Sequence, residues 1–138
     1  MTSSLIDSNV IIDLMTAHPQ FAGWGREKLV SLGAIGPLVV NQICFAETAA
    51  YFKTLPEFDT AIARLGVKRD DLPWEACGTA GLAHRTYRQS GGARDRILPD
   101  FLIGAHAAAK GYRILTRDGA RYRKYFPQVE VIAPDSHP

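Results

Sequence analysis

Residues 4–14 read Ser-Leu-Ile-Asp-Ser-Asn-Val-Ile-Ile-Asp-Leu, and they decide the fold because an apolar run is broken at one point by polar residues. Leu5 and Ile6 predict the end of a short buried strand, and residues 10–15 predict a helix with Asp13 on its outer side. Asp7 lies between the two elements. In open α/β sheets, ligands bind just beyond the carboxyl ends of strands, so Asp7 is a candidate site residue.

The same alternation of strand and helix continues along the whole chain. Apolar runs predict strands that include residues 5–6, 37–41, 112–116 and 129–132. Helical spacing, with glycine or proline at the ends, predicts helices near residues 20–32, 43–53, 57–65, 75–89, 99–110 and 119–125. Residues 68–71 read as a polar patch and residues 93–98 as a charged loop. Strands that alternate with helices predict a parallel sheet covered by helices on both faces.

Length and composition predict one soluble domain over residues 1–138, of which 46% are hydrophobic. A chain of this length buries about two-thirds of its unfolded surface without needing a metal or a disulfide. Cys44 and Cys77 have no metal-site spacing, and we expect both to be reduced core residues. No basic leader and no apolar stretch of ~20 residues is present, so we expect a cytoplasmic protein without membrane contact.

Charge is distributed unevenly along the chain, although the net charge is only +2. Residues 1–83 carry six basic and nine acidic side chains, whereas residues 84–138 carry ten basic and five acidic ones. This asymmetry suggests a positive surface for a polyanion, but ordinary solvated helix faces explain it equally well.

Four acidic residues occupy positions from which they can meet at one edge of the sheet. Asp7 and Asp118 follow predicted strands, and Glu47 and Asp100 lie in apolar helices. Asp100 and Asp118 are also explained as helix dipole or capping residues, but a carboxylate among apolar neighbours, as at Glu47, needs a cation. If all four converge, a divalent metal must offset their repulsion, and oxygen ligands favour Mg²⁺ or Mn²⁺ over zinc.

The sequence lacks the motifs of several other kinds of active site. The histidines form no His-Glu-x-x-His pair, and we expect all four to be surface or core residues: His18, His84, His106 and His137. There is no Gly-x-Ser-x-Gly elbow and no glycine-rich phosphate loop. The sequence therefore gives no support to serine hydrolases or nucleotide-binding proteins.

The pattern of acids and apolar runs resembles that of PIN-domain proteins, most closely the VapC ribonuclease toxins of bacterial toxin–antitoxin pairs. The resemblance covers essentially the whole chain, and its main segments are LIDSNVIID at 5–13, Glu47, PDFLIGAHA at 99–107, LTRD at 115–118 and YFPQVEVIAP at 125–134. It implies a three-layer α/β/α sandwich with a short central parallel sheet.

The resemblance also implies the chemistry of the site. By this likeness Asp7 and Asp100 are the direct Mg²⁺ ligands, and Glu47 and Asp118 complete the acidic cluster. Three small polar residues orient these acids: Ser8, Asn9 and Thr116. The implied reaction is hydrolysis of an RNA phosphodiester by a metal-activated water. Asp13 is left out of the site.

Basic residues late in the chain are candidates for gripping the RNA backbone. The first choices are Arg94, Arg96, Arg117 and Arg121, while simple solvated charge remains the alternative for each. Asp95 reads as a surface residue. Tyr122 and Tyr125 offer stacking surfaces, but core packing is the better interpretation for both.

The resemblance implies protein partners, and two rival functions remain open beside it. A toxin of this type is held inactive by a cognate antitoxin, and a homodimer and a toxin–antitoxin hetero-oligomer are expected. Some apolar residues could form docking surfaces, although core packing is the better interpretation for any one of them: Phe21, Trp24, Tyr51 and Phe52. The rivals are a phosphatase with Asp7 as nucleophile, although its second aspartate is replaced by Asn9, and a non-catalytic RNA- or protein-binding module.

Overall fold

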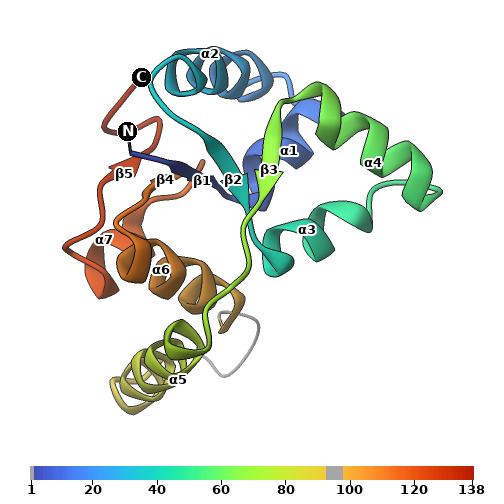
Figure 1. The fold of residues 1–138 in the computed structure, drawn as a ribbon. Coiled ribbons are helices and arrows are strands. Elements are labelled where there is room, and N and C mark those ends of the chain that lie inside the picture. Colours follow the sequence, from blue (N-terminus) through green and yellow to red (C-terminus); the bar gives the residue numbers. More distant parts are fainter. Residues whose placement is uncertain (1, 93–97) are drawn as a thin grey trace.

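Helices and strands alternate in the computed structural model of the protein, which describes residues 2–92 and 98–138 (Figure 1). The strands are β1 (Ser4–Ile6), β2 (Leu38–Val40), β3 (Val67–Arg69), β4 (Arg113–Leu115) and β5 (Val131–Ile132). The helices are α1 (Ser8–Met15), α2 (Ala22–Gly33), α3 (Gln42–Ala49), α4 (Leu55–Arg64), α5 (Trp74–Gln89), α6 (Leu98–Lys110) and α7 (Ala120–Tyr125). No helix in this described part of the chain combines the length and apolar character needed to cross a membrane.

The strands form one sheet of five parallel strands in the order β3-β2-β1-β4-β5. Figure 1 shows α2 on one side of the sheet and α6 and α7 on the other. This arrangement confirms the predicted three-layer α/β/α sandwich. The chain adds β2 and β3 on one side of β1 and then crosses to add β4 and β5 on the other side. Such a crossover leaves a crevice at the carboxyl ends of β1 and β4.

The central strands are buried on both faces, which explains their continuous apolar sequences. Leu5 and Ile6 of β1 and Ile114 and Leu115 of β4 have no exposed surface. Cys44 is fully buried, as expected for a reduced core residue. The expectation for Cys77 is wrong in part, because this side chain on α5 is only half-buried.

The sequence did not reveal strand β3, because residues 68–71 read only as a polar patch and the first two of them belong to this strand. Val67 is the buried residue of this strand, whereas Lys68 and Arg69 are exposed. β3 lies at the edge of the sheet, where charged side chains are tolerated and protect against pairing with other chains. Its sequence therefore lacks the apolar run by which the other strands were found.

Asp13 does not lie on the outer side of α1, as the sequence suggested. Its residue is 3% exposed because α1 packs against both α2 and α3. The carboxylate is paired with Arg117, whose Nε lies 3.2 Å from Asp13 Oδ2. The guanidinium of Arg117 also lies 5.1 Å from the centre of the Phe21 ring. A buried carboxylate requires such a cation, so Asp13 and Arg117 form a structural pair.

Substitution of Gly104 by alanine tests the packing of α6 against the chain after α7. A Cβ atom at Gly104 would overlap the ring of Phe126, which is buried and 3% exposed. We expect Gly104→Ala to lower the free energy of unfolding by about 1–3 kcal/mol, as overpacked core positions do. Urea unfolding measures this change.

The matched control is Gly23→Ala, because Gly23 lies on α2 and a Cβ atom there meets open space. Alanine favours helix, so this variant should be as stable as the wild type or more stable. Equal stability of Gly104→Ala and the wild type would contradict the described packing.

Candidate metal site at the ends of β1 and β4

Asp7 is fixed at the crossover by its backbone and its side chain. Its N–H donates to the carbonyl of Leu115 at 2.9 Å, which joins the ends of β1 and β4. The residue is extended and caps α1, where its Oδ1 accepts a hydrogen bond from the Ser8 N–H at 2.8 Å. An aspartate is suited to this position because it satisfies a free N–H at a helix start.

The second oxygen of Asp7 accepts two hydroxyl hydrogen bonds. Thr116 Oγ1, from the end of β4, and Tyr122 Oη, from α7, each donate to Oδ2 at 2.9 Å. The residue is only 5% exposed, and burial raises its pKa to about 6; the nearby Asp100 carboxylate adds to this increase. The bonds from Thr116 and Tyr122 act in the opposite direction, because they favour the charged form.

Glu47 approaches the same crevice from α3. Ser8 Oγ donates to Glu47 Oε1 at 2.9 Å, so one serine links the first two acids of the cluster. Glu47 is half-buried, and partial burial raises its pKa. The bond from Ser8 lowers the pKa and the negative charge of Asp100 raises it.

Asp100 lies in the first turn of α6 and is paired with Arg121 of α7 through Oδ2 and Nη1. Burial raises the pKa of Asp100 although Arg121 acts to lower it, and Asp118 raises it further. The side chains of Asp100 and Arg121 are 30% and 38% exposed, so the pair is partly open to solvent. Arg121 is the one cation that an ion pair joins to the four acids in the described part of the chain.

The loop after β4 is held by a network around Thr116. Asn9 Nδ2 donates to Thr116 Oγ1 at 3.2 Å, and Asn9 Oδ1 accepts from the Arg117 N–H at 3.0 Å. The Asp118 N–H also points to Thr116 Oγ1, at 3.2 Å. The Asp118 side chain is exposed, and its charge acts on Asp100. This network holds the loop that carries Asp118 beside Asp7.

A second buried network joins the helices that carry Glu47 and Asp100. Asn41 caps α3 by accepting from the N–H groups of Ile43 and Cys44, and its Nδ2 donates to His106 Nδ1 of α6 at 3.1 Å. His106 Nε2 donates to Asp70 Oδ2 at 3.2 Å. Burial lowers the pKa of His106, although Asp70 opposes this shift. His106 is thus a core histidine, as expected, and it connects α3 to α6.

The structure brings most of the predicted site residues together. The hydrogen-bonded group contains Asp7, Ser8, Asn9, Glu47 and Thr116, and Asp100, Asp118 and Arg121 surround it. The guanidinium of Arg117 turns away to Asp13. Three predicted residues lie outside the described part of the chain: Arg94, Asp95 and Arg96.

Tyr122 is the contact residue that the sequence did not reveal. Its side chain is buried, which confirms the expectation of core packing, but its hydroxyl also binds Asp7. A tyrosine in a short basic helix gives no sign of this role. Burial and the negative charge of Asp7 raise the pKa of Tyr122 well above its usual value, so it remains a hydrogen donor.

The donor set fits a hard divalent cation. All four acids offer carboxylate oxygens, and the pKa values of Asp7, Glu47 and Asp100 are raised, first by burial and then by the negative charge of neighbouring acids. Within the described ranges, no three acidic, histidine or cysteine side chains are close enough to hold one ion together. Mg²⁺ is commonly bound by one or two carboxylates and several waters, so a site with only two protein carboxylates is compatible with this ion.

The raised pKa of Asp7 predicts a loss of stability in the metal-free protein as pH increases from about 4 to 6. The carboxyl titrates near 3.8 when unfolded and at about 6 when folded, so the folded chain binds more protons in this window. Stability therefore falls as pH rises, by about 3 kcal/mol for this group. Chemical denaturation with a chelator present, repeated across the window, measures the slope.

Asp7→Asn should remove most of this pH dependence, because the amide does not titrate. Asp59→Asn is the control, since Asp59 is an exposed acid on α4 that pairs with Arg69 and lies outside the acidic cluster. The dependence of stability on pH should be the same in this variant as in the wild type. An unchanged slope in Asp7→Asn would contradict the burial of a charged Asp7.

Removal of the Tyr122 hydroxyl should raise the pKa of Asp7 above about 6, because the hydrogen bond from this hydroxyl favours the charged form. We expect Tyr122→Phe to show this increase in a carboxyl NMR titration and to bind Mg²⁺ more weakly. Tyr125→Phe is the control from the same helix, since Tyr125 contacts aromatic rings rather than Asp7. Identical titrations of Asp7 in the two variants would refute this role.

Comparisons with known proteins agree with this fold. The family model described as PIN domain matches residues 4–127. VapBC2 from Rickettsia felis, solved with a DNA fragment from its promoter, has a TM-score of 0.73 at 15% identity, over 96% of this chain and 98% of that one. VapBC-1 from nontypeable Haemophilus influenzae has a TM-score of 0.68 at 19% identity, with the same coverage. A toxin–antitoxin complex from Klebsiella pneumoniae has a TM-score of 0.66 at 20% identity, over 95% and 97%.

At these identities the solved structures establish the fold alone. No sequence among curated proteins matches the chain. The family model covers most of the chain and includes Asp7, Glu47, Asp100 and Asp118. The chain therefore belongs to the PIN-domain family.

Proposed function

We propose that the protein is a Mg²⁺-dependent endoribonuclease of the VapC type, with Mn²⁺ as an alternative ion. The observation that carries the proposal is the buried Asp7 carboxylate at the ends of β1 and β4, whose pKa is raised by burial and by the negative charges of Asp100 and Glu47. A cluster of this kind is unfavourable for an isolated fold and becomes favourable when it binds a cation. Membership of the PIN family and similarity to toxin–antitoxin structures support the same function.

Each residue of the cluster has a separate task in this proposal. Asp7 and Asp100 hold the metal, and Glu47 and Asp118 bind waters or accept a proton. When bound, Mg²⁺ acidifies a water and offsets the charge that develops on the phosphodiester. Thr116 and Tyr122 hold Asp7 in its charged form and fix its orientation. Asp100 must share its carboxylate between the metal and Arg121, or release Arg121.

Arg121 is the best candidate among the predicted RNA contacts. Its guanidinium lies next to Asp100 and is 38% exposed, so it can bind a phosphate as the substrate approaches. Three other basic residues that follow β4 already have partners: Arg117 pairs with Asp13, Arg123 pairs with Asp135, and Lys124 lies over the ring of Tyr125.

The proposed partners are a cognate antitoxin and a second copy of the chain, and the proposed place of action is the cytoplasm. The solved relatives from Rickettsia felis and Haemophilus influenzae are VapBC proteins, and the one from Klebsiella pneumoniae is a toxin–antitoxin complex. Their coverage extends over almost the whole chain, which supports the transfer of this arrangement as a proposal.

The geometry disfavours a phosphatase with Asp7 as nucleophile. Both oxygens of Asp7 accept hydrogen bonds, and the residue is 5% exposed. A nucleophilic carboxylate needs an oxygen that can reach the phosphorus in line with the leaving group. A non-catalytic binding module has no use for three acids with raised pKa values.

Replacement of either proposed metal ligand should abolish RNA cleavage. We expect the wild-type protein to cleave RNA with Mg²⁺, to lose activity with a chelator and to arrest growth when expressed without its genomic neighbour. Asp7→Asn and Asp100→Asn should lower the cleavage rate by more than ~100-fold, as expected for groups that act in the transition state. Quantitative cleavage of a labelled RNA measures the rates.

Asp59→Asn removes an exposed acid away from the cluster and should remain fully active. Equal toxicity of Asp100→Asn and the wild type would rule out the proposed mechanism. Phosphorylation of Asp7 by a phosphate ester would support the phosphatase instead, and RNA binding without cleavage would support the non-catalytic module.

A further inference from the structure

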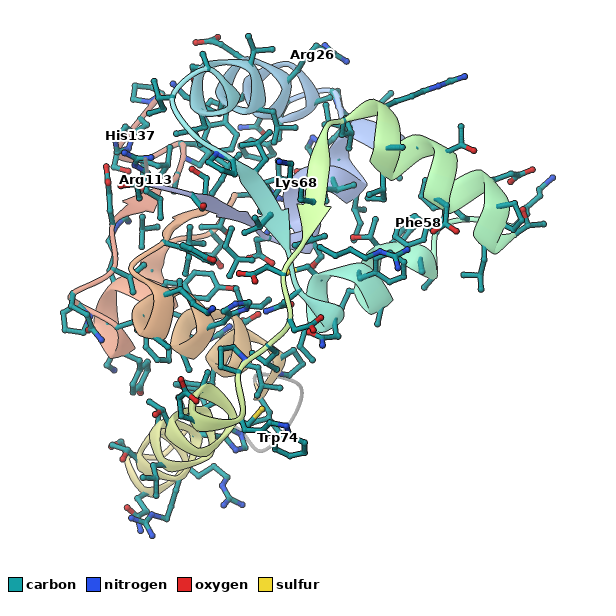
Figure 2. The ribbon with its side chains drawn as sticks, in the orientation of Figure 1. Arg26, Phe58, Lys68, Trp74, Arg113 and His137 are labelled. Atoms are coloured by element: carbon teal, nitrogen blue, oxygen red, sulfur yellow. The ribbon has the colours of Figure 1, made fainter. Side chains whose placement is uncertain are left out.

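Arg121 holds one of the two carboxylates that the proposed function assigns to the metal. Its Nη1 donates to Asp100 Oδ2, and the two side chains form an ion pair between α7 and α6. Figure 1 and Figure 2 show these two helices next to each other at one edge of the molecule. A guanidinium and a divalent cation both bind carboxylate oxygens through their positive charge, so they compete for Asp100.

The backbone that carries Arg121 is anchored, whereas its side chain is not enclosed. Tyr122, the next residue, is buried and donates to Asp7, and Phe126 is buried against Gly104 of α6. The side chain of Arg121 is 38% exposed and that of Asp100 is 30% exposed. The guanidinium can therefore exchange one partner for another without any movement of α7.

The ion pair is of a kind that another ligand can separate. Partly exposed ion pairs are weak, because water screens the attraction and two long side chains must be held in one geometry. Arg121 also brings a single positive charge to a group of four acids, so it offsets their repulsion only in part. A divalent cation satisfies the acids better, and a phosphate is a bidentate partner for the guanidinium.

The nearby basic residues have partners that do not belong to the acidic cluster. Arg117 pairs with the buried Asp13, and Arg123 pairs with Asp135 and also donates to Ser136. Within residues 2–92 and 98–138, Arg121 is the cation that an ion pair joins to the cluster. Competition for Asp100 by a side chain of the described structure therefore depends on this one residue.

We propose that Arg121 couples metal binding to RNA binding: it occupies Asp100 until a phosphate of the RNA takes its guanidinium and leaves the carboxylate to the metal. This inference rests on the proposed function, because it takes Asp100 as a metal ligand and RNA as the substrate. Each ligand then favours the other, since both separate the same ion pair. By linkage, RNA strengthens Mg²⁺ binding by the factor by which Mg²⁺ strengthens RNA binding. Without RNA, the ion pair keeps the metal affinity low.

The first test measures Mg²⁺ binding to the full chain without RNA, from the NMR shifts of its carboxyl groups. Arg121→Gln should bind Mg²⁺ about tenfold more tightly than the wild type, because it removes a competitor for Asp100 and a like charge beside the metal. Arg123→Gln is the matched control, since it removes the same charge from the same helix but its partner Asp135 lies outside the cluster. The Mg²⁺ affinity of this control should remain close to that of the wild type.

The second test measures the coupling itself in a Glu47→Gln background, in which cleavage should be slow. A labelled single-stranded RNA is titrated with and without Mg²⁺ and followed by fluorescence anisotropy. With Arg121 present, Mg²⁺ should strengthen RNA binding by about tenfold, within the usual range of coupling between two sites. The factor should fall clearly in Arg121→Gln and should be retained in Arg123→Gln.

A Mg²⁺ affinity of Arg121→Gln equal to or below that of the wild type would overturn the proposal, and so would an unchanged coupling factor in this variant. If the wild type still cleaved RNA with Mg²⁺, these results would leave the proposed function intact. Tighter Mg²⁺ binding by Arg121→Gln without cleavage of RNA by the wild type would instead support the competition for Asp100 and reject the nuclease. A wild type that binds no Mg²⁺ would overturn both.

Discussion

A buried carboxylate at the crossover between β1 and β4 is the constraint on which the rest of the molecule depends. Asp7 must be charged to bind a cation, yet burial and the neighbouring Asp100 favour its neutral form. The fold opposes this tendency with hydrogen bonds from the start of α1, from the end of β4 and from α7. Three separate elements thus converge on one side chain, and the sheet order that makes β1 central is what allows them to meet.

The other acids are held near Asp7 against their mutual repulsion. Glu47 and Asp100 lie on α3 and α6, and these two helices are joined through the contact of Asn41 with His106. His106 is fully buried, and its second nitrogen binds Asp70 after β3. The groups of this network are neutral or carry a single charge. They fix the distance between α3 and α6, so the repulsion between Glu47 and Asp100 does not separate the two helices. This explains how a fold with three raised carboxylate pKa values keeps one defined crevice.

The sequence predicted those features whose cause is local. The strands β1, β2, β4 and β5 are apolar because both of their faces are covered, and the four acids stand out against apolar helices or strand ends. The parallel sheet with helices on both faces follows from that pattern, and the meeting of Asp7 with Ser8, Asn9 and Thr116 is what the family resemblance implied.

Features with a tertiary cause were missed. β3 is an edge strand whose charged residues hide its period, and Asp13 is buried only because α2 and α3 both cover α1. Tyr122 acts through a hydroxyl that meets Asp7 across 115 residues of sequence, which no local pattern encodes. Arg117 lies between Thr116 and Asp118 in the sequence, but its side chain pairs with Asp13. Proximity along the chain therefore did not indicate its partner.

The most direct test of the account is a crystal structure of the protein grown with Mn²⁺, with the metal located by anomalous scattering. The account predicts a peak at the ends of β1 and β4, within about 2.2 Å of carboxylate oxygens of Asp7 and Asp100. It also predicts that Asp7 keeps its bonds from Thr116 and Tyr122 when the metal is bound. Absence of a peak in this crevice at saturating Mn²⁺, or a peak held by other residues, would contradict the central claim.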